Sequence, residues 1–275
     1  MRGLDKVMAF QALHSRRQPL ILPNPLDAGS AKILTSMGFE ALATTSAGLA
    51  FSLGRRDAEG DLSRGEILAN AQSIVEATHL PVSADLENGF GDSPEEVSKT
   101  IRMAADIGLV GGSIEDATGN PLAPIYEFSL ALERVIAGAE AARSLSLPFV
   151  FVARAENFSA GITDLDDTVR RLIAFEQVGA DVLFAPGLPS LNAIKLVCEA
   201  LQKPVHVVMG LADSTLTVDE LAEVGVRRIS LGSSFARAAL GEFIRAAEEV
   251  KTMGTFNFAN NAISFQEANS LMAPI

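Results

Sequence analysis

The segment PVSADLENGFG, residues 81–91, ends a short apolar run in two carboxylates and a glycine-rich turn. Side chains of a strand alternate between its faces, so Asp85 and Glu87 are expected on the same face at the strand's carboxyl end. Two such close charges repel each other, which favours a shared proton or a bound divalent cation. Because carboxylate oxygens are hard ligands, the expected cation is Mg²⁺, with Mn²⁺ as an alternative. Acidic residues and glycines also form ordinary surface turns, so this segment alone leaves both interpretations open.

Polar residues are expected at the carboxyl ends of several further apolar runs. They are Thr44, Thr45 and Ser46 after one run, where Ala47 and Gly48 follow, Ser113, Glu115 and Asp116 after another, and Arg154 and Glu156 after a third. Several acids at one site would destabilise each other without a cation, and Arg154 is suited to bind a substrate carboxylate through two parallel N–H bonds. A buried network of ion pairs that serves only stability is the alternative interpretation.

The pattern that would bring these residues together is a repeat of strand and helix. Eight short apolar runs have the composition of strands: 19–23, 41–46, 81–85, 111–116, 148–154, 181–186, 204–209 and 227–232. Amphipathic segments such as 63–78, 93–108 and 163–179 lie between them and open on Ser, Thr or Asp, as helices do. The alternation predicts an α/β fold, a single closed (β/α)₈ TIM barrel over residues 1–275, whose active site lies at the carboxyl ends of the strands. A doubly wound sheet is the alternative fold.

The composition restricts the expected partners. The chain has 275 residues, of which 48% are hydrophobic and 20% are charged, and its formal net charge is −12. This acidic balance argues against binding to nucleic acid or to an anionic membrane, because both need clustered Lys and Arg. No signal peptide and no run of about 18 uncharged apolar residues is recognisable. With Cys198 as the single cysteine, we expect a soluble cytoplasmic protein that binds small molecules.

The last residues, 252–275, extend beyond the last helix of the predicted barrel and carry several large apolar side chains: Phe256, Phe258, Ile263, Phe265 and Leu271. A closed barrel has no interior left for them. They are therefore expected to form a C-terminal helical tail that packs on the barrel or on a neighbouring subunit. We accordingly expect a homo-oligomer, either a dimer or a tetramer.

Five segments resemble the isocitrate lyase and phosphoenolpyruvate mutase superfamily in their order and approximate spacing. They are LPNPLDAGSAKIL (22–34), ATTSAGLAFSLGRRD (43–57), VSADLENGFG (82–91), GGSIED (111–116) and VARAENF (152–158). The resemblance covers roughly residues 13–240. It implies that Asp85 is a direct Mg²⁺ ligand and that Asp57, Glu87 and Glu115 hold the ion through water.

The same resemblance implies how substrate binds and reacts. Residues 45–48, which are Thr45, Ser46, Ala47 and Gly48, would contact substrate oxygens, together with Asp85 and Arg154. Arg154, Ser46 and Glu115 would be the catalytic residues. The family implies a Mg²⁺-dependent carbon–carbon lyase that acts on a 2-oxo or 2-hydroxy carboxylate, similar to isocitrate or methylisocitrate, through a metal-stabilised enolate. A metal, a hydroxyl, backbone N–H groups and an arginine do form a suitable site for an enolate oxygen.

One segment departs from the family pattern. The lyases carry a lysine-rich loop with a cysteine after the fourth strand, whereas ATGNPLAPIYEF (117–128) contains no Cys, His or Lys. Tyr126 is the one proton donor expected there, and Asn120 alone is a thin match to the mutases. Two alternatives therefore stay open. One is an oxaloacetate decarboxylase or hydrolase that uses the same enolate site, and the other is a catalytically idle barrel that binds a 2-oxo acid.

Residues elsewhere in the chain are expected to be structural. Cys198 lies in a predicted helix, where an inert buried thiol is favoured over a nucleophile. The histidines His14, His79 and His206 precede the barrel, end a helix and lie inside a strand, and we expect none of them to be catalytic.

Overall fold

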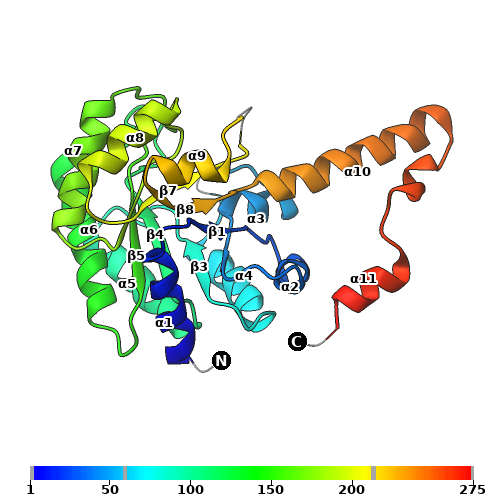
Figure 1. The fold of residues 1–275 in the computed structure, drawn as a ribbon, viewed down its shortest axis with the longest axis horizontal. Coiled ribbons are helices and arrows are strands. Elements are labelled where there is room, and N and C mark those ends of the chain that lie inside the picture. Colours follow the sequence, from blue (N-terminus) through cyan, green and yellow to red (C-terminus); the bar gives the residue numbers. More distant parts are fainter. Residues whose placement is uncertain (1–2, 58–60, 212–214, 274–275) are drawn as a thin grey trace.

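The computed structural model describes residues 3–57, 61–211 and 215–273. Their eight strands form one parallel sheet in the order β1-β8-β7-β6-β5-β4-β3-β2. The strands are β1 Leu20–Leu22, β2 Leu42–Ala43, β3 Val82–Asp85, β4 Gly111–Glu115, β5 Val150–Arg154, β6 Val182–Phe184, β7 Val205–Val208 and β8 Val226–Ser230. The sheet is barrel-like, which confirms the predicted fold class (Figure 1).

Hydrogen bonds join the two ends of this strand order. The side-chain amide of Asn24 donates to the carbonyl oxygen of Thr44 at 2.8 Å, and its oxygen accepts from the backbone N–H groups of Leu231 and Gly232 at 2.8 and 2.9 Å. A backbone hydrogen bond of 3.1 Å from Ala43 to the residue after β1 lies beside it. One side chain thus links the ends of β1, β2 and β8 and closes the barrel.

Helices surround the sheet in chain order (Figure 1). They are α1 Gly3–His14, α2 Ala28–Ser36, α3 Ser46–Ser52, α4 Arg64–Glu76, α5 Pro94–Asp106, α6 Phe128–Arg143, α7 Leu165–Gln177, α8 Leu191–Ala200, α9 Val218–Glu223, α10 Ser234–Met253, the 3₁₀ turn η1 Asn257–Asn260 and α11 Phe265–Leu271. Local signals set their starts: Ser63 and Glu66 form a reciprocal capping box at α4, and Pro94 occupies the first turn of α5.

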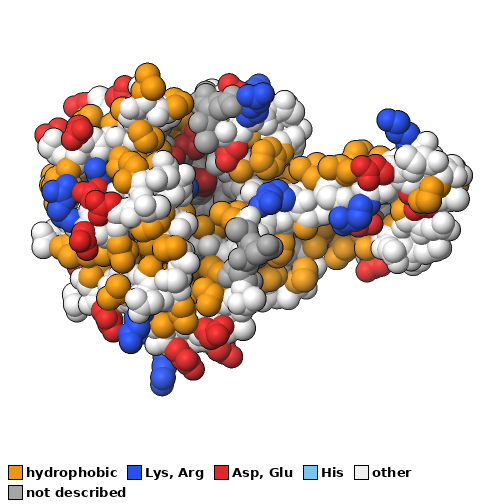
Figure 2. Space-filling view, turned by 90° about the horizontal axis from the view of Figure 1, so that it is seen from above, with side chains coloured by type: hydrophobic (Ala, Val, Ile, Leu, Met, Phe, Trp, Pro, Cys, Tyr) orange, Lys and Arg blue, Asp and Glu red, His pale blue; other side chains and the backbone are white. Residues whose placement is uncertain are grey.

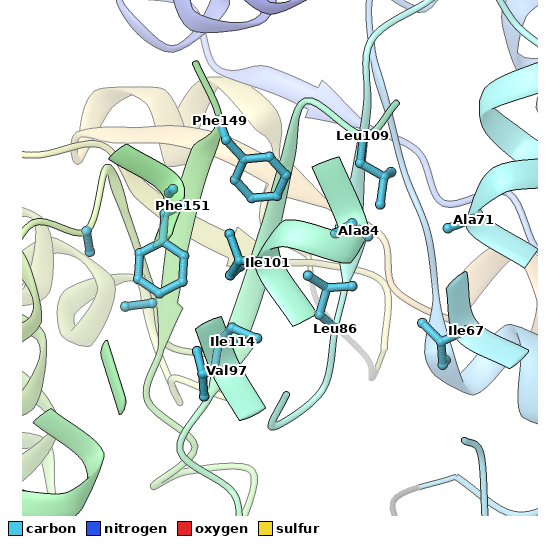
Figure 3. Packing of buried hydrophobic residues seen from close by; sticks show 14 of the residues in the cluster. Ile67, Ala71, Ala84, Leu86, Val97, Ile101, Leu109, Ile114, Phe149 and Phe151 are labelled. Atoms are coloured by element: carbon cyan, nitrogen blue, oxygen red, sulfur yellow. The ribbon is translucent and has the colours of Figure 1, made fainter. Parts of the chain in front are cut away.

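Two apolar layers hold the strands in place. Outside the sheet, Ile67 of α4 and Ile101 of α5 pack with Ala84 of β3 and Ile114 of β4 (Figure 3). Inside the sheet, Phe10 of α1 belongs to a second cluster with residues at the amino ends of the strands. Because α1 fills that end of the barrel, the open end is the carboxyl end.

The observed strands lie within or overlap the predicted runs, with one informative difference. The run 41–46 was expected to be one strand, but β2 ends at Ala43 and Ser46 already begins α3. The side chain of Thr45 accepts a hydrogen bond from the backbone N–H of Gly48 and caps this helix. Polar residues that can cap a helix therefore end this strand early.

The C-terminal helices form an arm. Helix α10 runs away from the barrel, and the chain returns through η1 to α11 beside α2, where the Lys32 side chain donates to the carbonyl oxygens of Met272 and Ala273 (Figure 1). Large apolar side chains remain exposed along the arm, among them Phe243 at 72% and Phe265 at 83% (Figure 2). None of the helices in the described ranges combines the length and apolarity that a membrane crossing requires.

Candidate active site

A cavity of about 520 Å³ lies at the carboxyl ends of the strands and receives nearly all the predicted site residues. Those that line it are Thr45, Ser46, Ala47, Asp57, Asp85, Glu87, Glu115 and Arg154. Gly48 does not line the cavity. A Cβ atom there would lie 2.5 Å from Cγ2 of Thr45, so the tight start of α3 favours a glycine at this position.

Asp85, the last residue of β3, is held in one orientation by three neighbours. Its Oδ2 accepts a hydrogen bond from the hydroxyl of Ser46 at 3.0 Å, and its Oδ1 accepts from the backbone N–H of Glu87 at 3.3 Å. The backbone N–H of Asp85 donates to the hydroxyl of Thr44 at 3.0 Å. The carboxylate therefore has a defined direction before any ligand binds, as a site that relies on preorganisation requires.

Arg154, the last residue of β5, lies among the acidic side chains. Its Nη1 is 3.1 Å from Oε2 of Glu115 and 3.8 Å from Oδ1 of Asp85, and its Nε contacts the Glu156 carboxylate. Its side chain is 19% exposed. Although burial opposes the charge, the three carboxylates outweigh this effect and raise the pKa of Arg154 above its usual value. The guanidinium is thus permanently charged and partly accessible from the cavity.

Negative charge is in excess around this arginine. The pKa of Glu87 is raised to about 8, first because the carboxyl is buried and then because Asp85 and Asp57 repel a further charge. Burial also raises the pKa of Glu115 well above its usual range, although Arg154 counteracts it. Glu87 has a left-handed backbone with φ 47°, which a residue with a side chain rarely adopts and which costs on the order of 1 kcal/mol.

This oxygen-rich, mutually repelling set fits a hard divalent cation, because such a cation would relieve the repulsion. Within the described residues, no three His, Cys, Asp or Glu side chains converge on a common point that could hold an ion. The acids are instead oriented by Ser46 and Arg154. Mg²⁺ is a hard cation that is commonly bound through one or two carboxylates while it keeps several waters, and carboxylates held in this way are ligands of the type it prefers.

The segment after β4 covers one side of the cavity. Ala117 and Ile125 form an antiparallel bridge, and the Thr118 hydroxyl donates to the carbonyl oxygen of Ala123 at 2.6 Å, so the segment is a compact turn. Residues 118–121 and 124 line the cavity, and they include Asn120. The lining on this side therefore consists of Thr118, Asn120 and two prolines, with Gly119 between the first two.

Two residues that the sequence placed at the mouth lie away from it. Tyr126 does not line the cavity. Its hydroxyl donates to Asp92 at 2.7 Å, and burial raises its pKa to about 12, so the expected proton donor is turned away from the site. Asp116 accepts from the backbone N–H of Glu156 at 2.8 Å and from Nη1 of Arg171 at 3.1 Å. It ties β4 to β5 and α7 and has a structural role.

The structure adds cavity residues that the sequence did not reveal. Asn24, His206, Arg228 and Ser230 all line it. His206, which we did not expect to be catalytic, is only 4% exposed but points inward on β7 and lines the cavity. Arg228 and Ser230 are two residues apart on β8, so the alternation of a strand could have placed both on the inner face. By contrast Cys198 lies outside, and burial raises its thiol pKa to about 11, as expected for an inert cysteine.

Comparison with known proteins identifies relatives over nearly the whole chain. The family model for phosphoenolpyruvate phosphomutase matches residues 10–251. The 2-methylisocitrate lyase of Escherichia coli K12 is 27% identical over 88% of this chain and 82% of its own, and an uncharacterized protein of Mycobacterium tuberculosis is 30% identical over 88% and 89%. Among solved structures, a protein of Burkholderia cenocepacia J2315 described as a "putative lyase/mutase" is 50% identical with a TM-score of 0.96, over 98% of this chain and 96% of that one.

Proposed function

The chain belongs to the phosphoenolpyruvate mutase and isocitrate lyase superfamily, and from this membership we propose that it is a Mg²⁺-dependent carbon–carbon lyase. The superfamily contains lyases, mutases and hydrolases that act on carboxylates. We propose a 2-oxo or 2-hydroxy carboxylate as the substrate, with cleavage through the enolate of a 2-oxo acid. The observation that carries the proposal is the convergence of Ser46, Asp85 and Arg154 in one cavity.

Each residue has a task in this proposal. Asp85 would bind Mg²⁺ directly, while Asp57, Glu87 and Glu115 would hold its waters. When bound, Mg²⁺ supplies a Lewis acid that stabilises negative charge on substrate oxygens. Arg154 would donate N–H bonds to a carboxylate or enolate oxygen.

Ser46 and Glu115 would support these contacts. The Ser46 hydroxyl keeps Asp85 aligned, and the first-turn N–H groups of α3 at Ser46 and Ala47 have no partner within the helix. Glu115 orients Arg154 through their 3.1 Å contact. Together these groups form an oxyanion site on rigid strand ends.

A second candidate, cleavage of oxaloacetate by decarboxylation or hydrolysis, is favoured by one observation. The cover of the cavity, residues 117–125, contains no Cys, His or Lys, and Tyr126 is bonded to Asp92. Oxaloacetate cleavage uses the same enolate site and needs no thiol acid from this loop. A binding barrel without turnover is the third candidate.

A substrate panel tests the proposal. The purified protein is incubated with Mg²⁺ and isocitrate, methylisocitrate, dimethylmalate, oxaloacetate or phosphonopyruvate. The products measured are 2-oxo acids, from lyase cleavage or decarboxylation, and oxalate with acetate, from hydrolysis of oxaloacetate. Asp85→Ala protein prepared in parallel is the control for contaminating enzymes. We expect product from a branched or hydroxylated di- or tricarboxylate. Product from oxaloacetate alone would select the second candidate, and metal-dependent binding without any product would select the third.

A further inference from the structure

We propose that the inner end of the cavity is a second carboxylate-binding subsite formed by Arg228, His206 and Ser230, and that the substrate is a short dicarboxylate whose far carboxylate binds there. The inference rests on the proposed function, which places the other carboxylate of the substrate beside Asp85 and Arg154. We call the three residues the floor of the cavity. They lie on β7 and β8, inside the barrel, and all three line the same cavity as Asp85 and Arg154.

Arg228 has hydrogen-bond donors without partners. Its side chain is only 2% exposed, and its Nη2 donates to the hydroxyl of Ser83 at 3.2 Å. Its Nε and Nη1 have no hydrogen-bond partner among the described residues. A buried donor without an acceptor costs roughly 1–3 kcal/mol, and more when it is charged. Arg228 lines the cavity, so a ligand that reaches its buried guanidinium can supply the acceptor.

Its charge is also uncompensated, unlike that of the other buried arginines. Arg171 is paired with Asp116 and Asp167, and Arg134 donates to backbone carbonyl oxygens. Burial lowers the pKa of Arg228 to about 9, and no carboxylate among the described residues offsets it. An unpaired buried cation is costly for the fold, so the missing partner is expected to be an anion.

His206 and Ser230 complete the subsite. Nε2 of His206 is 2.8 Å from the hydroxyl of Ser230, and its Nδ1 has no partner in the described part of the chain. The imidazole is kept neutral because burial and the charge of Arg228 lower its pKa. A neutral imidazole and a hydroxyl carry one donor each, and the bond between them uses one of the two. The pair therefore has one donor left for a carboxylate oxygen, beside the free donors of Arg228.

The distance between the two ends of the cavity limits the ligand. The ring of Phe184 lies between them: its centroid is 5.0 Å from Cζ of Arg154 and 3.9 Å from the centroid of the His206 ring. One aromatic ring therefore separates the arginine on the metal side from the floor. A molecule that reaches both must carry its two anionic groups a few bonds apart, as a short dicarboxylate does.

The test compares ligands that share one metal-binding group. N-Oxalylglycine and N-oxalyl-β-alanine carry an oxalyl group and a far carboxylate, whereas N-methyloxamate has the same oxalyl group without it. Binding to wild-type protein with Mg²⁺ is measured by calorimetry. We expect at least one dicarboxylate to bind more tightly than N-methyloxamate by about tenfold or more, which is about 1.4 kcal/mol or more, because its far carboxylate gains charge-assisted hydrogen bonds. Equal binding of all three ligands would overturn the inference.

Variants then assign the effect to the floor. Arg228→Met should lower dicarboxylate affinity about tenfold or more and leave N-methyloxamate unchanged, while raising the melting temperature of the ligand-free protein because a buried charge is removed. Arg227→Met, on the opposite face of the same strand, is the matched control and should change neither affinity.

If Arg228→Met does not fold, Ser230→Ala serves instead, with a smaller loss for dicarboxylates only. Equal losses for both ligand classes would overturn the inference, whereas no Mg²⁺-dependent binding of any ligand to wild type would count against the proposed function.

Discussion

The cavity and the C-terminal arm depart from ordinary globular structure in opposite ways. In the cavity, charged side chains such as Arg154 and Glu115 are largely buried. On the arm, Phe243 and Phe265 are largely exposed. Burying charge and exposing large apolar groups both cost free energy unless a partner is bound. From this difference we expect the two regions to bind different partners, a polar small molecule in the cavity and an apolar protein surface on the arm.

The arm repeats its exposed apolar side chains at helical spacing. Leu240, Phe243, Ile244 and Ala247 of α10 lie three or four residues apart and share one face of the helix. An anionic membrane is not the expected partner of this face, because such membranes attract basic helices and the chain has a formal net charge of −12. We therefore propose that a second copy of the chain covers it in a homo-oligomer.

The largest effect is expected from removing the Asp85 carboxylate, the proposed metal ligand of the polar cavity. Asp85→Ala should reduce turnover by about a thousandfold or more, because a direct metal ligand supplies both charge and geometry. Turnover is measured with the substrate that the panel identifies, with Mg²⁺ varied. Glu87→Ala and Glu115→Ala should lose less, since a water between carboxylate and ion tolerates partial replacement. Full activity after exhaustive chelation would contradict this prediction.

Arg154→Lys separates catalysis from stability at the same site. Lysine keeps the charge but loses the planar pair of donors, so kcat/KM should fall about thirty- to a thousandfold, which is roughly 2–4 kcal/mol. The melting temperature should change little. If Arg154 served only to neutralise Glu115 and Glu156, stability would fall by roughly 1–3 kcal/mol while kinetics stayed constant. Measuring both quantities on one variant decides between the two roles.

Phe243→Glu tests whether the exposed apolar face of α10 binds a second copy of the chain. A charge on the exposed face of α10 should weaken assembly about thirtyfold, since truncating a buried anchor in an interface costs roughly 2 kcal/mol. Light scattering over micromolar concentrations measures the mass. Met8→Glu is the matched control, because Met8 is 56% exposed on α1 and should not affect assembly. A monomeric wild type would contradict the proposed homo-oligomer.

The smallest effect is expected from the pH dependence of Glu87. Its pKa rises from about 4.5 unfolded to about 8 folded, so the folded protein binds the extra proton and stability is lost as the pH rises between these values. The slope is at most about 1.4 kcal/mol per pH unit. Denaturation without Mg²⁺ should show a smaller slope for Glu87→Gln than for wild type, and Mg²⁺ should flatten the wild-type slope. An identical slope in both proteins would contradict the assignment.

The parts that the sequence predicted well are those set by local patterns. The apolar runs and the caps at residues such as Ser63 predicted the alternating strands and helices, and Asp85 and Arg154 fell at strand ends as expected. Their convergence followed from the barrel rule that strand ends share one mouth. The roles proposed for them in catalysis stay predictions.

Long-range pairing was not predictable in the same way. Nothing near Tyr126 in the sequence indicates that Asp92, 34 residues earlier, accepts its hydroxyl. The partners of Arg228 depend on which strands become neighbours, and a buried arginine cannot be told from an exposed one by residue type alone. The hydrogen bonds of Asn24 with Leu231 and Gly232, which lie 207 and 208 positions later in the chain, are a third case.

Those Asn24 bonds also bear on when the protein becomes competent during synthesis. The segment that supplies Leu231 and Gly232 leaves the ribosome after nearly all of the barrel, and contacts over such separations form slowly because a long loop must close. Until then β1 has no β8 with which to pair, and the barrel that precedes α10 is incomplete. Closure of the barrel is therefore expected late in the folding of this chain, and assembly of the proposed homo-oligomer is expected only after it.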